Sequence, residues 1–306
     1  MRVAAVDLGT NSTRLLVADV DDGRVEEVAR DSQITRLGEG VDERRKLLPL
    51  PVARVRNVLS EYRREVERLG AERVLTIGTS AVRDAENGEA FLGEIEWSDG
   101  FTTRLLSGEE EAELTRRGVA NGRAVGDETV VLDVGGGSTE LITARDRVSL
   151  ELGCVRLTER HLRSDPPANE ELDDAARAVR EALPDWSPGD AIGVAGTVTS
   201  LAALELGEYD PEQTHGYRLS GESVERQLER LASLPLAERR ELPGLEPERA
   251  PVIVAGALIV REFLDRYGLD GIEVSERDLL HGVALEAAEL PEPQEGDAPP
   301  GAFTCC

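Results

Sequence analysis

Runs of apolar residues alternate with helical patterns along most of the chain. Val3–Val6 and Val74–Ile77 predict buried strands, because they are too short for helices and lie next to turn residues. From Val52 to Leu69 the apolar positions fall at helical spacing, with Pro51 before them and Gly70 directly after them. Strands that alternate with helices in this way predict an α/β fold.

The second half of the chain repeats the order of the first. Each half is predicted to begin with a three-stranded antiparallel meander. In the first half the strands are expected at 3–6, 15–18 and 25–37, the last in two pieces, 25–29 and 32–37. In the second half they are expected at 129–133, 141–143 and 147–152. Helices are predicted at 170–183, at 252–264, which is apolar nearly all round, and at 279–290.

A polar, glycine-rich stretch near 118–127 divides the chain into two predicted domains, 1–120 and 121–278. The closing helix, about 279–290, follows the second domain. Residues 291–306 are rich in proline, glycine and acidic residues, and they predict a disordered tail.

The two meanders contain the same hairpin sequence. Leu132–Ile142 aligns without gaps on Val6–Leu16. The identical pairs are Asp7 and Asp133, Gly9 and Gly135, Ser12 and Ser138, Thr13 and Thr139, and Leu15 and Leu141. Glycines let backbone N–H groups approach an anion, and the hydroxyl groups add donors. One such turn is an ordinary hairpin, but its repetition indicates two phosphate-binding units that would hold one phosphate group from both sides of a cleft.

Carboxylates flank the second hairpin loop. Asp133 precedes its glycines and Glu140 follows its hydroxyl residues. Oxygen ligands beside phosphate donors are what a magnesium–phosphate complex requires.

Two further loops join a predicted strand to a helix, at 78–84 and at 193–199. The carboxyl ends of strands face the ligand crevice in open α/β sheets, so Arg83 and the Gly196–Thr197 pair are candidate site residues. A helix cap at Thr79 or Ser80 with a surface Arg83–Asp84 pair explains the first loop equally well. A tight strand–helix turn explains the second loop.

Three glutamates begin the helix predicted after Ser107. Glu109, Glu110 and Glu111 are favourable to the helix dipole, and one of them can instead serve as a general base. Later in the chain, Arg156 and Arg160 lie one helical turn apart and can form a basic spot for a phosphate tail, whereas Cys154 is expected to be packed.

Charge and composition narrow the classes of function. The net charge of −26 argues against a nucleic-acid binder or a membrane-surface protein, so a polyanionic substrate would depend on local arginines and a divalent cation. We recognise no signal peptide, membrane-spanning run or disulfide framework, and we expect a cytoplasmic protein. His161, His215 and His281 lack metal-ligand spacing. His215 and Arg218 fall in a predicted loop and are weaker candidates for substrate contact.

With these loops in place, the chain resembles the exopolyphosphatase/guanosine pentaphosphate phosphohydrolase (Ppx/GppA phosphatase) family, part of the acetate and sugar kinase, Hsc70 and actin superfold. The matching motifs, in family order, are Asp7–Ser12, Gly78–Asp84, Ser107–Leu114, Asp133–Glu140, Leu152–Glu159 and Gly193–Thr199. The resemblance implies two actin-like (ribonuclease H-like) domains with an interdomain cleft, and a closing helix that packs back onto the first domain.

The resemblance also implies roles for individual residues. Glu111 falls on the family's catalytic base, and Asp133 and Glu140 fall on positions tied to Mg²⁺ or another divalent cation. The implied phosphate-binding positions are Asp7, Thr10, Asn11, Ser12, Arg83, Gly135, Gly136, Gly137, Ser138, Gly196 and Thr197. Thr10 stands where many relatives have serine, and it keeps the hydroxyl group. The stretch Ser275–Gly282 departs from the family's closing Gly-Leu-Arg-Glu-Gly motif.

The implied function is an exopolyphosphatase that releases terminal orthophosphate from inorganic polyphosphate by in-line attack of water. A guanosine pentaphosphate (pppGpp) 5′-phosphohydrolase, a phosphotransferase of the same superfold and a non-catalytic polyphosphate- or nucleotide-binding module are the alternatives. No nucleic-acid or membrane partner is expected, and a homodimer is one assembly that the sequence allows.

Overall fold

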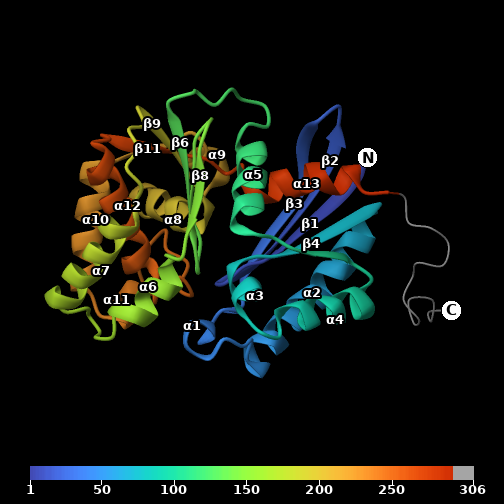
Figure 1. Cartoon of the computed structure of the whole chain (residues 1–306), viewed down its shortest axis with the longest axis horizontal. Coiled ribbons are helices and arrows are strands. Elements are labelled where there is room, and N and C mark those ends of the chain that lie inside the picture. Colours follow the sequence, from blue (N-terminus) through green and yellow to red (C-terminus); the bar gives the residue numbers. More distant parts are fainter. Residues whose placement is uncertain (292–306) are drawn as a thin grey trace. The chain divides into compact units, whose positions relative to one another are not determined.

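The computed structural model describes residues 1–291, which form two compact units (Figure 1). Unit 1 contains Met1–Arg123 together with the segment from Leu279, and unit 2 contains Ala124–Asp278. Beyond residue 291, the predicted disordered tail lies outside the described residues.

Unit 1 is built on a five-stranded sheet in the order β3-β2-β1-β4-β5. Strand β1 is antiparallel to β2, whereas β1, β4 and β5 run parallel. The strands are β1 Arg2–Leu8, β2 Ser12–Asp21, β3 Arg24–Ile34, β4 Arg73–Gly78 and β5 Thr102–Leu105. The helices are α1 Val41–Arg44, α2 Pro49–Leu69, α3 Ser80–Asp84, α4 Gly88–Asp99, α5 Gly108–Val119 and the closing α13 Leu279–Glu289.

Unit 2 has a six-stranded sheet in the order β10-β11-β9-β6-β7-β8. Its meander β6-β7-β8 is antiparallel, and β6, β9 and β11 run parallel, as β1, β4 and β5 do in unit 1. The strands are β6 Thr129–Val134, β7 Thr139–Ile142, β8 Arg147–Leu150, β9 Asp190–Val194, β10 Arg218–Ser220 and β11 Gly271–Val274. The helices are α6 Cys154–His161, α7 Asn169–Ala182, α8 Ala195–Leu206, α9 Pro211–Thr214, α10 Gly221–Ser233, α11 Leu236–Arg239 and α12 Ile253–Tyr267.

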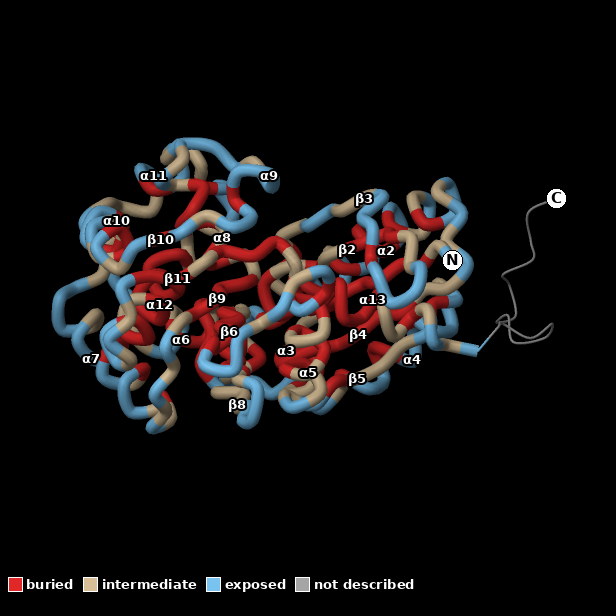
Figure 2. The backbone as a smooth tube through the Cα atoms, turned by 90° about the horizontal axis from the view of Figure 1, so that it is seen from above, coloured by how far each residue is buried: buried red, intermediate tan, exposed pale blue. Residues whose placement is uncertain are grey.

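The central strands β1 and β6 are buried, and in unit 1 helices cover both faces of the sheet. In β1, Ala4, Val6 and Leu8 belong to the cluster that contains residues of α2 and α4, and the alternate residues Val3 and Ala5 belong to the cluster that contains residues of α13. Figure 2 shows these strands as buried and most connecting loops as exposed. The predicted α/β class, with two mixed sheets, is confirmed.

Some elements differ from their sequence-based prediction. Strand β3 is continuous from Arg24 to Ile34, and residues 35–40 turn away from it instead of extending it to Leu37. The helices α4 and α10 were not predicted, although α10 carries Val224, Leu228 and Leu231 at helical spacing. No helix in residues 1–291 combines the length and apolar character needed to cross a bilayer.

Candidate functional site

In each unit, the candidate residues lie where parallel strands end. Strands β1, β4 and β5 are in register through Leu8, Gly78 and Leu105, so the first hairpin, the start of α3 and the start of α5 share one edge of the sheet in unit 1. In unit 2, Asp133 is in register with Val194, so the second hairpin and the start of α8 share an edge. These are the carboxyl edges at which α/β sheets bind ligands.

The second hairpin loop is held from behind by helix α6. The carbonyl oxygens of Gly135, Gly136 and Gly137 all accept hydrogen bonds from it. The donors are, in order, the backbone N–H of Cys154 at 3.0 Å, the backbone N–H of Val155 at 2.8 Å and Nε of Arg156 at 2.8 Å. Since each peptide unit is planar and trans, the N–H that shares a peptide with each carbonyl points the opposite way. The N–H groups of Gly136, Gly137 and Ser138 therefore point away from α6, as in an anion-binding nest.

The first hairpin has the same construction with a different support. Gly9 N donates to Ser12 O at 3.0 Å, as Gly135 N donates to Ser138 O at 3.0 Å. The backbone N–H of Gly38 donates to Thr10 O at 2.8 Å, and that of Arg36 donates to Asn11 O at 2.9 Å. The loop 36–38 thus supports the first hairpin as α6 supports the second. The N–H groups of Asn11 and Ser12, which share a peptide with these two carbonyls, point away from the loop.

The loop behind the first hairpin is fixed by α2. Arg54 Nε donates to Thr35 O at 2.6 Å, and Nη2 donates to the Glu39 carboxylate at 2.9 Å. The Thr10 hydroxyl is buried, and Oγ1 has no hydrogen-bond partner within the described chain. It is therefore available as a donor to a ligand.

Asp133 and Glu140 lie opposite each other on β6 and β7. They are only 5% and 1% exposed, respectively, and the Ser149 hydroxyl donates to Glu140 Oε1 at 2.6 Å. Two hard oxygen ligands suit Mg²⁺, which commonly takes one or two carboxylates and completes its shell with water and substrate phosphates. No group of three or more His, Cys, Asp or Glu side chains in residues 1–291 could hold a metal ion.

In the first hairpin, an arginine stands at the position equivalent to Glu140. Arg14 is opposite Asp7 in the β1–β2 register, and its Nε and Nη2 donate to Asp7 Oδ2 at 2.9 and 2.7 Å. Asp7 is 3% exposed. The two hairpins therefore share a backbone but differ in charge, since only the second has two opposed carboxylates.

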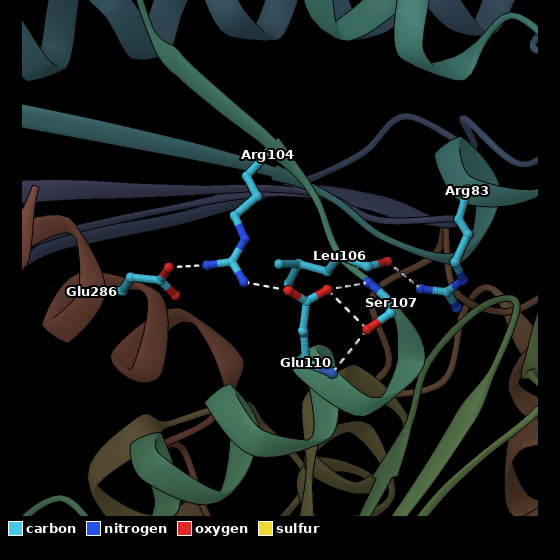
Figure 3. Close-up of polar contacts among 6 residues, drawn as sticks. All are labelled: Arg83, Arg104, Leu106, Ser107, Glu110 and Glu286. Carbon is cyan, nitrogen blue, oxygen red and sulfur yellow. Dashed lines mark hydrogen bonds and ion pairs between the residues drawn. The ribbon is translucent and has the colours of Figure 1, made fainter.

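The start of α5 is fixed by a capping box. Ser107 Oγ accepts from the Glu110 N–H at 3.2 Å, and the Glu110 carboxylate accepts from the Ser107 N–H at 2.8 Å. Arg104 lies between Glu110 and Glu286 and pairs with both (Figure 3). The capping hydrogen bond from the Ser107 backbone, followed by Arg104, lowers the pKa of Glu110 to about 2. Glu110 thus has a structural role.

The other two glutamates have different environments. Glu109 is exposed, whereas Glu111 is 7% exposed and accepts from Arg83 Nη1 at 3.2 Å. The same Nη1 donates to Leu106 O at 2.8 Å, as Figure 3 shows. Nε and Nη2 of Arg83 have no hydrogen-bond partner within the described chain, so they are available to an anion. Arg83 therefore pairs with Glu111 instead of forming the alternative surface pair with Asp84, and Thr79 makes no side-chain cap.

The start of α8 brings Gly196 and Thr197 to the edge of unit 2. Thr197 Oγ1 donates to Val134 O at 3.2 Å, which ties this turn to the second hairpin strand. Ala195 has φ of 65°, a strained left-handed conformation at the first residue of the helix. Arg249 lies against Gly196, because a Cβ atom built there would be 2.0 Å from Arg249 Nη1.

Sequence reasoning did not identify Arg249 or Arg14. Arg249 is remote in sequence from the loop that it contacts, so no local pattern indicated it. Arg14 was visible in the repeat, where it aligns with Glu140. The weaker candidates have structural contacts instead, since Arg218 pairs with Asp190 at 2.7 Å and His215 Nδ1 accepts from the Glu276 N–H at 3.2 Å.

Cys154 supports the hairpin and is not exposed for reaction. Its N–H caps the loop, and burial raises the pKa of its thiol. It is packed, as the sequence predicted.

Unit 1 thus carries the first hairpin, Arg83 and Glu111, and unit 2 carries the second hairpin, Asp133, Glu140 and the Gly196–Thr197 turn. Backbone donors, an arginine with two open nitrogens and buried carboxylates are the groups that phosphoryl transfer uses.

Comparison with known proteins agrees with this chemistry. The model of the Ppx/GppA phosphatase family matches residues 16–290. Exopolyphosphatase 2 of Mycobacterium tuberculosis is 40% identical, over 94% of this chain and 98% of its own length. The guanosine-5′-triphosphate,3′-diphosphate pyrophosphatase of Vibrio atlanticus is 29% identical, over 94% of this chain and 59% of its own length.

Among solved structures, the PPX-GPPA enzyme of Aquifex aeolicus superposes with a TM-score of 0.80 at 32% identity, covering 94% of this chain and 99% of that one. Fold, motifs and relatives agree with one another. This chain therefore belongs to the Ppx/GppA phosphatase family.

Proposed function

We propose that this protein is an exopolyphosphatase that hydrolyses the terminal phosphoanhydride bond of inorganic polyphosphate. The observation that carries the proposal is the twinned hairpin, in which the carbonyl groups are held from behind and consecutive N–H groups are left for an anion. Each hairpin presents N–H groups that suit phosphate oxygens. The name of the mycobacterial relative supports polyphosphate as that substrate.

In the proposed reaction, water attacks the terminal phosphorus in line with the bridging oxygen. The bond from water to phosphorus forms, the bridging bond breaks, and Glu111 accepts the proton of the water. Arg83 positions Glu111 through Nη1 and binds phosphate oxygens with its two remaining nitrogens. The products are orthophosphate and a chain shorter by one unit.

The transition state of phosphoryl transfer needs neutralisation of charge more than a strong base. The N–H groups of Gly136, Gly137 and Ser138 are preorganised for it. Asp133 and Glu140 would hold Mg²⁺ or another divalent cation, which supplies positive charge to the phosphate oxygens.

Glu111→Gln tests the assignment of the base. A general base contributes about 10²–10⁴-fold, so the variant should release phosphate more slowly by that factor while its thermal unfolding is unchanged. Glu109→Gln is the matched control, because Glu109 is exposed two residues earlier and should keep wild-type activity. Full activity of the Glu111 variant would show that another group accepts the proton.

The substrate is tested by incubating the protein with Mg²⁺ and, separately, polyphosphate, guanosine pentaphosphate or ATP. Free phosphate from polyphosphate supports the proposal. Faster release from guanosine pentaphosphate would favour the activity named for the Vibrio relative. A phosphorylated acceptor would indicate a phosphotransferase, and binding without turnover would indicate a non-catalytic module.

The cellular setting is part of the same proposal. We propose a cytoplasmic enzyme, without nucleic-acid or membrane partners, that can form a homodimer. Light scattering coupled to size-exclusion chromatography tests the dimer directly.

A further inference from the structure

A cavity of about 360 Å³ lies within unit 2, between β8, α6 and α7. Its floor is apolar and consists of Leu150, Leu152, Leu157, Ala178 and Ala182. This volume lies within the range of sites for small organic molecules.

The polar part of the wall is basic. Arg156, Arg160 and His161 line it from α6, and Glu151 is the only carboxylate among the described residues of the wall. Glu151 is 81% exposed and 3.6 Å from Arg156 Nη1. In a chain with a net charge of −26, two arginines beside one cavity give it a basic wall that suits an anion.

Two residues of the wall also contact the candidate site. Arg156 donates through Nε to Gly137 O of the hairpin loop at 2.8 Å. Ser149 donates through Oγ to Glu140 Oε1 at 2.6 Å. An occupant that draws Arg156 or Ser149 toward itself therefore changes the support of the loop and of a candidate metal ligand.

We propose that this cavity binds an organic anion that has a flat apolar body and a phosphate group, of the nucleoside monophosphate class. The phosphate binds Arg160 and His161, and the body lies on the leucine and alanine floor. Inorganic polyphosphate is a poor occupant, because it is charged along its whole length and gains nothing from an apolar floor. Binding stands on the cavity alone, whereas its effect on phosphate release rests on the proposed function.

The binding test uses calorimetric titration of the full chain with AMP, ribose 5-phosphate and tripolyphosphate, in EDTA to prevent turnover. We expect AMP to bind about tenfold more tightly than ribose 5-phosphate, which lacks the apolar body. Equal affinity for the two would overturn the proposed role of the floor. Absence of AMP binding at millimolar concentration would overturn the site.

Two variants locate the ligand. Ala178→Leu fills the floor without a change in charge, and Arg160→Gln removes an exposed basic group. Each should weaken AMP binding about tenfold or more, while tripolyphosphate binding is retained. Arg163→Gln, an exposed charge outside the wall, is the matched control and should bind AMP like the wild type. AMP affinity unchanged in both variants, or loss of tripolyphosphate binding instead, would refute the assignment.

The coupling test measures phosphate release from polyphosphate with and without saturating AMP. We expect kcat/KM to change by about fivefold or more in the wild type and to be unaffected in Arg160→Gln at the same AMP concentration. If AMP binds and kcat/KM does not change, the coupling is refuted, whereas the binding site itself stands. If the protein releases no phosphate at all, the proposed function fails, and the titrations still decide the binding site.

Discussion

Gly153→Ala is the sharpest test of the hairpin nest, because it displaces the loop without removing any donor group. Gly153 is the residue before α6, with φ of −137° and ψ of 166°. Alanine adopts this extended conformation readily, so the backbone itself does not oppose the change. The added Cβ, however, would lie 2.4 Å from both C and O of Gly136 and 2.5 Å from N of Gly137.

The size of the effect follows from these distances. Carbon atoms pack at about 3.5–4.0 Å, so the loop and α6 must separate by roughly 1 Å. The hydrogen bonds that hold the loop carbonyls are 2.8–3.0 Å long and would be lost or bent by that movement. Overpacking costs about 1–3 kcal/mol of unfolding free energy, and a misplacement of 1 Å at a reacting centre can cost about 10²-fold in rate.

The assay compares phosphate release and thermal unfolding for Gly153→Ala and for Gly93→Ala. Gly93 lies inside α4, and a Cβ atom added to it would meet nothing within 4 Å among the described residues. Its substitution should therefore leave activity unchanged and stabilise the fold by about 0.5–1 kcal/mol. We expect Gly153→Ala to lose about 10²-fold in kcat and to stay folded. Wild-type kcat and KM in a folded Gly153→Ala would refute the idea that the loop N–H groups hold the reacting phosphate.

The remaining predictions concern three other contacts. Gly282→Ala would place a methyl group 1.9 Å from Leu114 O, so it should force α13 from α5 and destabilise the fold by about 1–3 kcal/mol in calorimetry; an unchanged unfolding midpoint would contradict this packing. The pKa of Glu110 is lowered to about 2, chiefly by the Ser107 backbone N–H, so its stabilisation is complete above the unfolded value of 4.5 and is lost as the pH falls toward 2. The difference in unfolding free energy between wild type and Glu110→Gln should therefore shrink over that window, and a constant difference would argue against the capping box. Arg249→Gln should raise KM for polyphosphate without changing the unfolding midpoint, and an unchanged KM would remove this arginine from the site.

The repeat in the sequence indicated much of the fold. The ungapped alignment of Val6–Leu16 with Leu132–Ile142 predicted two hairpins, and both have the same Gly-to-Ser backbone bond. Apolar runs located β1, β4 and β6, because strands covered on both faces are mostly apolar. The end of strand β3 was less predictable. It is set by hydrogen bonds between residues 36–38 and the first hairpin, which is remote from β3 in sequence.

The support of the site could not be predicted in the same way. The pattern placed three glutamates at the start of α5, but it did not show that Glu111 is buried beside a cation, since its partner Arg83 lies on another element. Glycines that permit close approach were equally hidden. Gly153 and Gly282 have unremarkable neighbours in sequence, and only the packing of α6 and α13 explains them.

The two hairpins share a backbone but differ in charge at one equivalent position. At equivalent positions, Asp7 faces Arg14, whereas Asp133 faces Glu140. Like charges directly opposite each other on neighbouring strands are destabilising, and more so when buried, so the second hairpin gains most from a bound cation. The arginine makes the first hairpin less attractive to a cation and better suited to phosphate oxygens.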